Sequence, residues 1–306
     1  MSLPIDHTIH RGELISQRRR SFRMAASVGP GLLWLGVFFA VPLGIVVVMS
    51  FLSRGEFGTV QRPWTWENFV RLAGFGLLGF DSLYPVIVLR SLILGLGTAL
   101  LCLVSGLPLA FFIARLAKPY KNLALILVVI PFWTNLLIRT YAWQMLLGPD
   151  SWISQAAAWI GMTASGEAVY PSAWAVYLCL VCDFLPFMVL PLYASVEKLD
   201  WSLAEAAMDL GANRFGVFQH GILPQIRPGL AAGFILVLLP ATGQFVIPDL
   251  LGGAKTVMLG NAIQQQFGPG LDWPFGSAIA VVSLVVVLLT MWFFLRQAGE
   301  HEVEIL

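Results

Sequence analysis

Apolar residues occur along this chain in blocks of about twenty, separated by shorter polar segments. A helix rises about 1.5 Å per residue, so about twenty residues cross a hydrocarbon core about 30 Å thick. Backbone polar groups inside lipid must be satisfied within the segment itself, which favours helices over strands. The pattern therefore predicts an all-α integral membrane protein with six transmembrane helices, at residues 31–52, 85–113, 122–147, 173–193, 228–248 and 276–295.

Composition agrees with a membrane protein and excludes other classes. Hydrophobic residues make up 58% of the 306 residues, charged residues only 11%, and the mean hydropathy is +0.80. Such a chain cannot cover itself with polar surface. A net charge of +1, with no basic run interleaved with aromatic residues, indicates no nucleic-acid partner. Cys179 and Cys182 have C-x-x-C spacing, but no His is near, so we predict plain packing and no metal site.

The distribution of Lys and Arg predicts the orientation. Of the 18 basic residues, 12 precede the first span or follow the second, fourth and sixth spans, and four lie on the opposite side. The positive-inside rule then places both termini and the 194–227 segment in the cytoplasm. The first span is too long for a cleaved signal peptide and is preceded by a polar stretch, so we expect it to remain as an anchor.

The segments 53–84 and 148–172 are predicted to face outward. In the second of these, five residues fit a short interfacial helix with Trp at headgroup depth: Trp152, Ile153, Ala156, Trp159 and Ile160. The alternative is an ordered loop without a helix.

A polar island lies between the fourth and fifth spans. Ser202 and Glu205 have the spacing of a capping box, in which each side chain bonds the backbone N–H near the other residue. Gly211 can adopt the left-handed conformation that ends a helix. These signals predict a helix of barely two turns.

The apolar face of this short helix protrudes little, because two of its four residues are Ala. Leu203, Ala206, Ala207 and Leu210 follow the i, i+3, i+4, i+7 rule, so they share one face that a partner groove could approach closely. We expect a second short helix over 213–220, with Pro224 and Pro228 punctuating the return into the fifth span. The alternative is an ordinary amphipathic connector on the membrane surface.

The island also resembles a known signature. Glu205-Ala206-Ala207, three residues, Gly211, nine residues, Gly221, one residue and then Leu223-Pro224 is similar to the signature loop of permease subunits of bacterial ABC importers. That family usually has Ile or Val at the position of Gly221, and we expect the smaller residue to loosen the second helix.

Further runs resemble the spermidine/putrescine permease subfamily. They are Ile-Pro-Phe-Trp-Thr-Asn at 130–135 and the runs at 138–143, 184–193, 245–253 and 272–276. The resemblance covers 85–295 well and the first span loosely. It implies the type I ABC importer permease fold, with a five-helix core plus an N-terminal extra helix that wraps a partner permease.

The resemblance also implies an organisation and a set of partners. Residues 1–84 hold the N-terminus, first helix and outer loop; 85–295 form the permease core with its coupling loop 194–227; 296–306 form a tail. The partners would be a cytoplasmic ATPase dimer, a second permease subunit and an external solute-binding protein, at the bacterial inner membrane. The residues that would contact the ATPase are Ser202, Leu203, Glu205, Ala206, Ala207, Leu210, Gly211, Leu223 and Pro224.

An ATP-driven importer needs a nucleotide site, and Gly252-Gly253-Ala254-Lys255-Thr256 looks superficially like a phosphate-binding loop. Ala254 stands where such a loop has the Gly that precedes Lys, and the segment leaves a membrane helix, not a strand. We therefore expect no cofactor in this chain and ATP bound by a separate ATPase.

Asp183 is the main candidate for the solute path, because an ionisable group at membrane depth is expensive unless it has a function or a partner. It could meet a cationic amine, or it could form a buried pair with Arg139. Trp133 and Tyr141 could line a polyamine route through cation–π contacts or could only pack. Gln244 stands where related sequences often carry a carboxylate, which leaves the solute open.

The leading hypothesis is thus a non-enzymatic permease subunit that imports polyamines or a related small cationic solute by alternating access. Another small organic solute is the nearest alternative. An intramembrane enzyme using Asp183 or the Cys pair would need a second catalytic group at matching depth, and the spans contain no paired Asp and no His. An exporter subunit is disfavoured because exporters commonly fuse the ATPase and lack such a loop.

Overall fold

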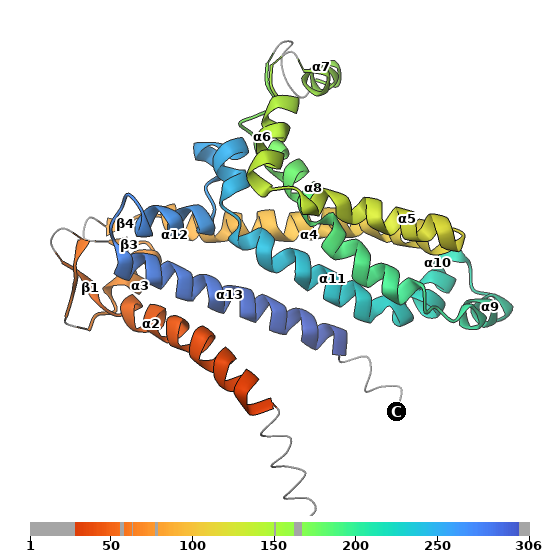
Figure 1. The fold of residues 1–306 in the computed structure, drawn as a ribbon, viewed down its shortest axis with the longest axis horizontal. Coiled ribbons are helices and arrows are strands. Elements are labelled where there is room, and N and C mark those ends of the chain that lie inside the picture. The colour runs from red at the N-terminus through yellow and green to blue at the C-terminus, as the bar shows by residue number, and fades with distance from the viewer. Residues whose placement is uncertain are drawn as a thin grey trace, which may run out of the picture.

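The computed structural model describes residues 28–299 except 56–57, 63, 77–78, 150 and 162–166. The predicted basic cluster at residues 11–23 and the predicted tail beyond 299 lie outside the described residues. Within the described part, five helices are long and apolar enough to cross a membrane: Val28–Ser50, α4 (Leu83–Arg115), α8 (Ala173–Val196), Arg214–Gly243 and α13 (Trp273–Gly299). Figure 1 shows them running alongside one another, and they correspond to five of the six predicted spans.

The third predicted span is broken. The prediction of one continuous helix over 122–147 is wrong: α5 (Lys118–Val129) continues into a 3-10 turn over Ile130–Trp133, and α6 (Leu136–Leu146) leaves it at 94°. Pro131 lies in that turn, where its missing N–H weakens helical continuation. Asn135 then caps α6, its side chain accepting a hydrogen bond from the Leu137 N–H at 2.8 Å. In Figure 1, α6 projects from the bundle and carries α7 at its far end.

The fifth span differs from the prediction at both ends. No separate helix covers 213–220, because α10 (Arg214–Gly216), a π-helical segment over Val217–Ile222 and α11 (Leu223–Gly243) run on as one helix. The wide π turn shifts the hydrogen-bonding register just before Pro224, so the helix continues through that proline. At the other end the helix stops at Gly243, five residues earlier than predicted.

The bundle is centred on α4, α8 and α11, which pack closely through small residues. A Cβ atom on Gly229 would lie 2.5 Å from the Pro191 carbonyl oxygen, and one on Gly233 would lie 2.9 Å from the Met188 sulfur. The Gly229–Gly233 pair therefore serves packing of α11 on α8 within the subunit. Cys179 is buried in the same core as a free thiol, as its apolar surroundings predicted.

One end of the bundle carries two short hairpins and two short helices. The strands β1 (Ser53–Arg54) and β2 (Val60–Gln61) pair antiparallel, as do β3 (Phe75–Gly76) and β4 (Gly79–Phe80). The helices at this end are α3 (Glu67–Leu72) and α12 (Leu259–Phe267), whereas α7 (Trp152–Trp159) lies beyond α6. The predicted helix around Trp152 is thus confirmed over the loop alternative. The opposite end carries α9 (Trp201–Asp209).

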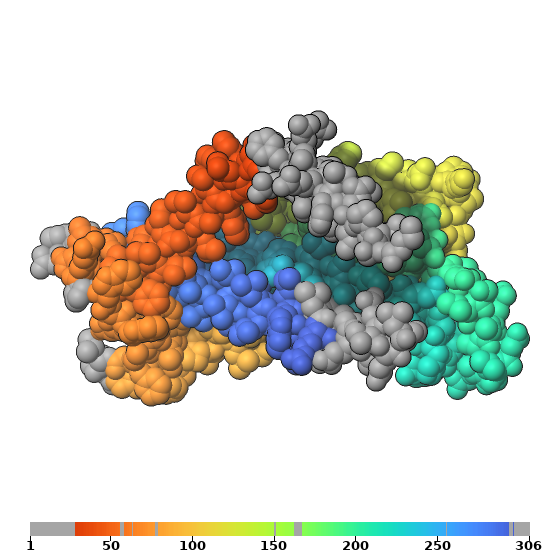
Figure 2. Space-filling view, turned by 90° about the horizontal axis from the view of Figure 1, so that it is seen from below, coloured from red at the N-terminus to blue at the C-terminus, as the bar shows by residue number. Residues whose placement is uncertain are grey.

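The N-terminal helix is attached along one side only. Its last part, α2 (Val41–Ser50), lies against α13, as Figure 2 shows, and Asn68 bonds the carbonyls of Ser50 and Leu52 to hold its end. The rest of its apolar surface, including Leu33 and Phe39, is exposed in the single chain. Such a surface needs lipid or another protein to cover it.

Replacing Gly229 by Val should destabilise the bundle by about 1–3 kcal/mol, because the added side chain overpacks the α8–α11 contact. Thermal unfolding of the purified chain in detergent would measure the loss. Gly44→Val is the matched control, since a Cβ there meets nothing within 4 Å. Equal unfolding temperatures for the two variants would contradict the packing described above.

Candidate functional site

The first turn of α9 is capped differently from the prediction. Asp200, not Ser202, is the N-cap residue, and its carboxylate accepts a hydrogen bond from the Ser202 N–H at 2.9 Å. A carboxylate is favoured here because it also faces the positive end of the helix dipole. Its hydrogen bonds with Ser202 hold the pKa of Asp200 below its ordinary value. The Ser202–Glu205 capping box is therefore wrong, and both side chains are exposed.

The last turn of α9 follows the prediction. Gly211 has φ +84°, in the left-handed region. Its N–H bonds the Met208 carbonyl at 2.9 Å, and the Ala212 N–H bonds the Ala207 carbonyl at 3.0 Å. This is a Schellman ending, which stops the helix after barely two turns.

The predicted docking face of α9 points away from the rest of the chain. Leu210 is 89% exposed, Leu203 is 52% exposed, Ala206 is exposed and Ala207 is half-buried. Ala204, on the other side of the helix, is buried. A short helix with an exposed apolar face and a buried reverse face is a surface that a partner can contact.

Gly221 has a role that the resemblance alone did not indicate. It is buried, and a Cβ atom there would lie 3.0 Å from the Ala204 Cα and 3.2 Å from the Leu203 carbonyl oxygen. The glycine therefore lets the π-helical segment lie directly against the backbone of α9. The expectation that Gly221 loosens this segment is wrong, because an Ile or Val side chain would not fit in this arrangement.

Gln225 lies at the α9 end of the bundle and was not identified from the sequence. Its Oε1 accepts a hydrogen bond from the Asp200 N–H at 2.9 Å, and its Nε2 donates to the Asp200 carbonyl at 3.1 Å and the Gly221 carbonyl at 2.7 Å. Its position directly after Leu223-Pro224 was the only local signal. Leu223 packs on the cluster of Val196, Leu199 and Ile226, and Pro224 is exposed.

Asp183 forms a buried ion pair. Its Oδ1 lies 2.6 Å from the Arg139 Nε, and the two side chains are 3% and 14% exposed. Arg139 also donates to the carbonyl of Pro131, across the bend between α5 and α6. The structure thus contains the predicted pair of Asp183 with Arg139. Contact of Asp183 with a solute stays a prediction.

The other predicted pathway residues lie apart from one another. Trp133 and Tyr141 are exposed on the two sides of the α5–α6 bend. Gln244 follows α11, and its Oε1 accepts hydrogen bonds from the N–H groups of Phe245 at 3.0 Å and Val246 at 3.4 Å. Its side chain therefore satisfies the backbone where the helix ends.

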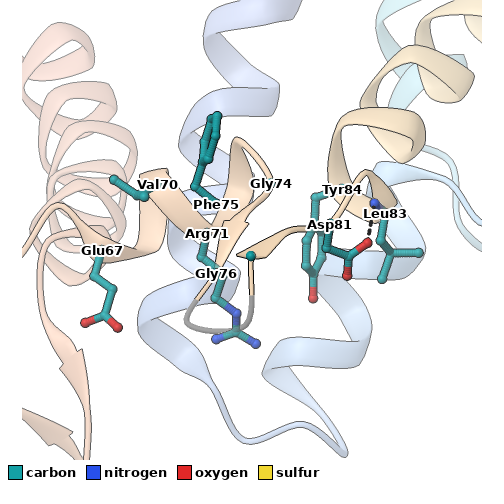
Figure 3. A pocket seen from close by; sticks show the side chains of 10 residues that line it. Glu67, Val70, Arg71, Gly74, Phe75, Gly76, Asp81, Leu83 and Tyr84 are labelled. Atoms are coloured by element: carbon teal, nitrogen blue, oxygen red, sulfur yellow. Dashed lines mark hydrogen bonds between the residues drawn. The ribbon is translucent and has the colours of Figure 1, made fainter.

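A cavity of about 640 Å³ opens at the end of the bundle opposite α9. Glu67, Arg71, Phe75, Asp81 and Tyr84 are among its lining residues, and Figure 3 shows Glu67, Arg71 and Tyr84 pointing to the same side.

Two of the charged groups that line this cavity, those of Arg71 and Asp81, are engaged within the chain. The Arg71 Nη1 is 2.8 Å from an oxygen of Asp272, and Asp81 accepts from the Leu83 N–H. The four predicted pathway residues do not line this cavity.

The chain is thus a bundle of membrane-length helices that carries at one end a short helix, α9, with an exposed apolar face. Residues 106–298 match the family described as the binding-protein-dependent transport system inner membrane component. The chain belongs to this family. It is therefore an inner membrane component of a transport system that works with a binding protein.

Curated relatives and solved structures agree. The chain is 40% identical to the spermidine/putrescine transport system permease protein PotB of Escherichia coli K12 over 262 residues, which cover 85% of this chain and 93% of the relative. The same protein of Salmonella typhimurium SL1344 is also 40% identical, over 86% of this chain and 89% of the relative. The resemblance to that subfamily is confirmed, and the relatives are transport permeases, not enzymes.

Among solved structures, the crystal structure of a bacterial ABC transporter for import of alginate matches with a TM-score of 0.71 and 18% identity, covering 94% of this chain and 99% of that chain. At this identity the match concerns the fold alone. The predicted ABC importer permease fold is confirmed.

Changing Asp183 to Leu or Arg139 to Met should each destabilise the protein by about 3–5 kcal/mol, because either change leaves one charge buried without its partner. The double variant should lose clearly less than the sum of the two, since no charge then remains. Thermal unfolding of all four proteins in detergent gives the double-mutant cycle. Simple additivity would show that the two side chains do not depend on each other.

Proposed function

We propose that this chain is a permease subunit of an ATP-driven importer that moves spermidine, putrescine or a related small cationic solute inward by alternating access. The family match, with 40% identity over most of the chain to relatives named as spermidine/putrescine permeases, is the observation that carries the proposal. The exposed apolar face of α9 supplies the place where an external motor can act.

The proposed motor is a cytoplasmic ATPase dimer that contacts α9 and holds the ATP. Residues 252–256 lie in helical turns after α11 and do not follow a strand, so this segment lacks the context of a phosphate-binding loop. The remaining partners are a second, related permease subunit and an external solute-binding protein. An alginate transporter of the same fold has been crystallised with its periplasmic protein.

The proposed orientation places the α9 end of the bundle in the cytoplasm. Arg115 ends α4 and Lys118 begins α5, and Figure 1 places this junction and the C-terminal end of α13 at the same end as α9. Basic residues near helix ends favour the cytoplasmic side. Both chain termini would then be cytoplasmic, and the hairpins and α12 would face the binding protein.

The proposed mechanism transfers motion from α9 to the bundle. Closure of the ATPase pair would displace α9, and its contacts with the cytoplasmic ends of α8 and α11 would rock this subunit against the second permease. Trp133 and Tyr141 are exposed in the single chain, so they are available to line a path between two subunits through cation–π contacts. The path itself would form only in the pair.

The polar side chains of the candidate pathway already have partners within the chain, which favours a second solute class. Asp183 is paired with Arg139 and Gln244 caps its own backbone, so neither offers a free carboxylate to an amine. Import of another small organic solute is the second candidate, with the choice made by the binding protein.

The direct test is uptake into proteoliposomes that hold this chain, its partner permease and the ATPase, with loaded binding protein outside and ATP inside. We expect radiolabelled spermidine to accumulate and the binding protein to stimulate ATP hydrolysis. Stimulated hydrolysis with a binding protein loaded by another solute, and none with spermidine, would replace the polyamine assignment. No stimulation by any loaded binding protein would reject the importer.

Changing Leu210 to Asp should reduce the amount of ATPase that copurifies with the permease pair by on the order of tenfold, since it places a charge at the most exposed residue of the docking face. Quantified gel bands after affinity purification measure the ratio. Val60→Asp, at the opposite end of the bundle, is the control and should retain the ATPase. Full retention with Leu210→Asp would place the ATPase contact elsewhere.

A further inference from the structure

Besides the packing of Gly221 against Ala204, three structural links could carry motion from α9 to the membrane helices. Two follow the chain: the turn from Val196 to Asp200, and the segment from Gly211 to Asn213. The second contains the left-handed Gly211 and is a flexible route, because glycine restricts the backbone least. The third link is the side chain of Gln225, which bypasses that segment.

The Gln225 side chain joins α9 to α11 through both polar groups of one residue. Asp200 is the N-cap of α9, so its own N–H has no partner within the helix. The Gln225 Oε1 accepts from this N–H at 2.9 Å, while the Nε2 donates to the Asp200 carbonyl at 3.1 Å. A primary amide is neutral and accepts through its oxygen while its nitrogen donates two hydrogen bonds, so it can bond an N–H and two carbonyls at once.

The same amide is anchored on its own helix. Its Nε2 also donates to the Gly221 carbonyl at 2.7 Å, one turn earlier, which restricts the side-chain rotamer. Gly221 in turn lies directly against the backbone of α9 at Ala204. The neighbouring residues Leu199 and Ile226 are both buried in the apolar cluster beneath. Displacing α9 from α11 would therefore break the two hydrogen bonds between Gln225 and Asp200 and open the contact of Gly221 with Ala204.

We propose that Gln225 is a positioning residue for energy coupling: it makes α9 and the cytoplasmic end of α11 move as one body. It does not need to touch the ATPase or the solute. This role rests on the proposed function, in which an ATPase acts on α9. Without the Gln225 amide, the ATPase would still bind the exposed face of α9, but displacement of α9 would be absorbed partly at Gly211.

The test is the number of ATP molecules hydrolysed per spermidine imported, in proteoliposomes containing the complete transporter. Gln225→Met keeps the length of the side chain and removes all three hydrogen bonds. We expect this ratio to rise on the order of three- to tenfold, while the content of ATPase stays unchanged. This factor is the change in an equilibrium constant to which one net hydrogen bond corresponds. Gln219→Met is the matched control, since Gln219 is exposed on the adjoining segment, and its ratio should equal that of the unaltered protein.

Hydrogen exchange supplies a second readout on the same samples. The Asp200 amide should exchange on the order of tenfold faster in Gln225→Met, because its acceptor is gone. If the Met variant fails to assemble, Gln225→Glu replaces it, since Glu keeps the acceptor and loses both donor bonds, and the ratio should again rise.

The outcomes separate the two proposals. An unaltered transporter that binding protein does not stimulate would reject the proposed function, and this inference with it. A stimulated transporter whose ATP-to-spermidine ratio is unchanged in the Gln225 variant would overturn this inference alone, and so would an unchanged exchange rate of the Asp200 amide in Gln225→Met.

Discussion

Every backbone polar group within lipid must find a partner inside the protein, and this constraint governs where the chain can depart from a helix. At two of the interruptions a polar side chain provides a missing partner. Asn135 caps α6 after the bend, and Gln244 accepts from two N–H groups after α11. Asn261 of α12 donates to the Phe245 carbonyl at 2.8 Å in the same region. These side chains thus satisfy part of the backbone where the helices are interrupted.

The same constraint explains the buried charge pair. Arg139 stands just beyond the bend and reaches two groups at once, the carboxylate of Asp183 on α8 and the carbonyl of Pro131 on the other side of the bend. Either charge alone would be costly at this depth, and the pair makes both tolerable. The pair also ties α6 to α8, so the direction in which α6 leaves the bundle is set by a long-range contact.

Close approach of helix backbones recurs in the structure, both in the core and at the α9 end of the bundle. Gly229 and Gly233 bring α11 onto α8, and Gly221 brings the start of the same helix onto α9. Small residues allow such contacts because no side chain separates the backbones. One continuous helix, Arg214–Gly243, therefore carries contacts from the exposed docking face to the centre of the bundle. Under the proposed function, this helix is the route by which motion of α9 reaches the bundle.

Much of the architecture follows from local sequence alone. The existence and approximate ends of five spans, the short helix ending at Gly211 and its low-relief apolar face depend on segment hydropathy, periodicity and single-residue conformational preference. Each of these is a property of residues that are close together in the sequence. The spacing of the signature motif is also such a local property, and it indicated the family. The tertiary structure alone decided the 94° bend and the pairing of Asp183 with Arg139, whereas the N-cap at Asp200 is a contact between residues two positions apart that the prediction wrongly assigned to Ser202. The tertiary structure also decided the contact of Gly221 with α9 and the hydrogen bonds of Gln225. These long-range contacts depend on how residues about 15 to 45 positions apart meet in space, and no local pattern carries that information.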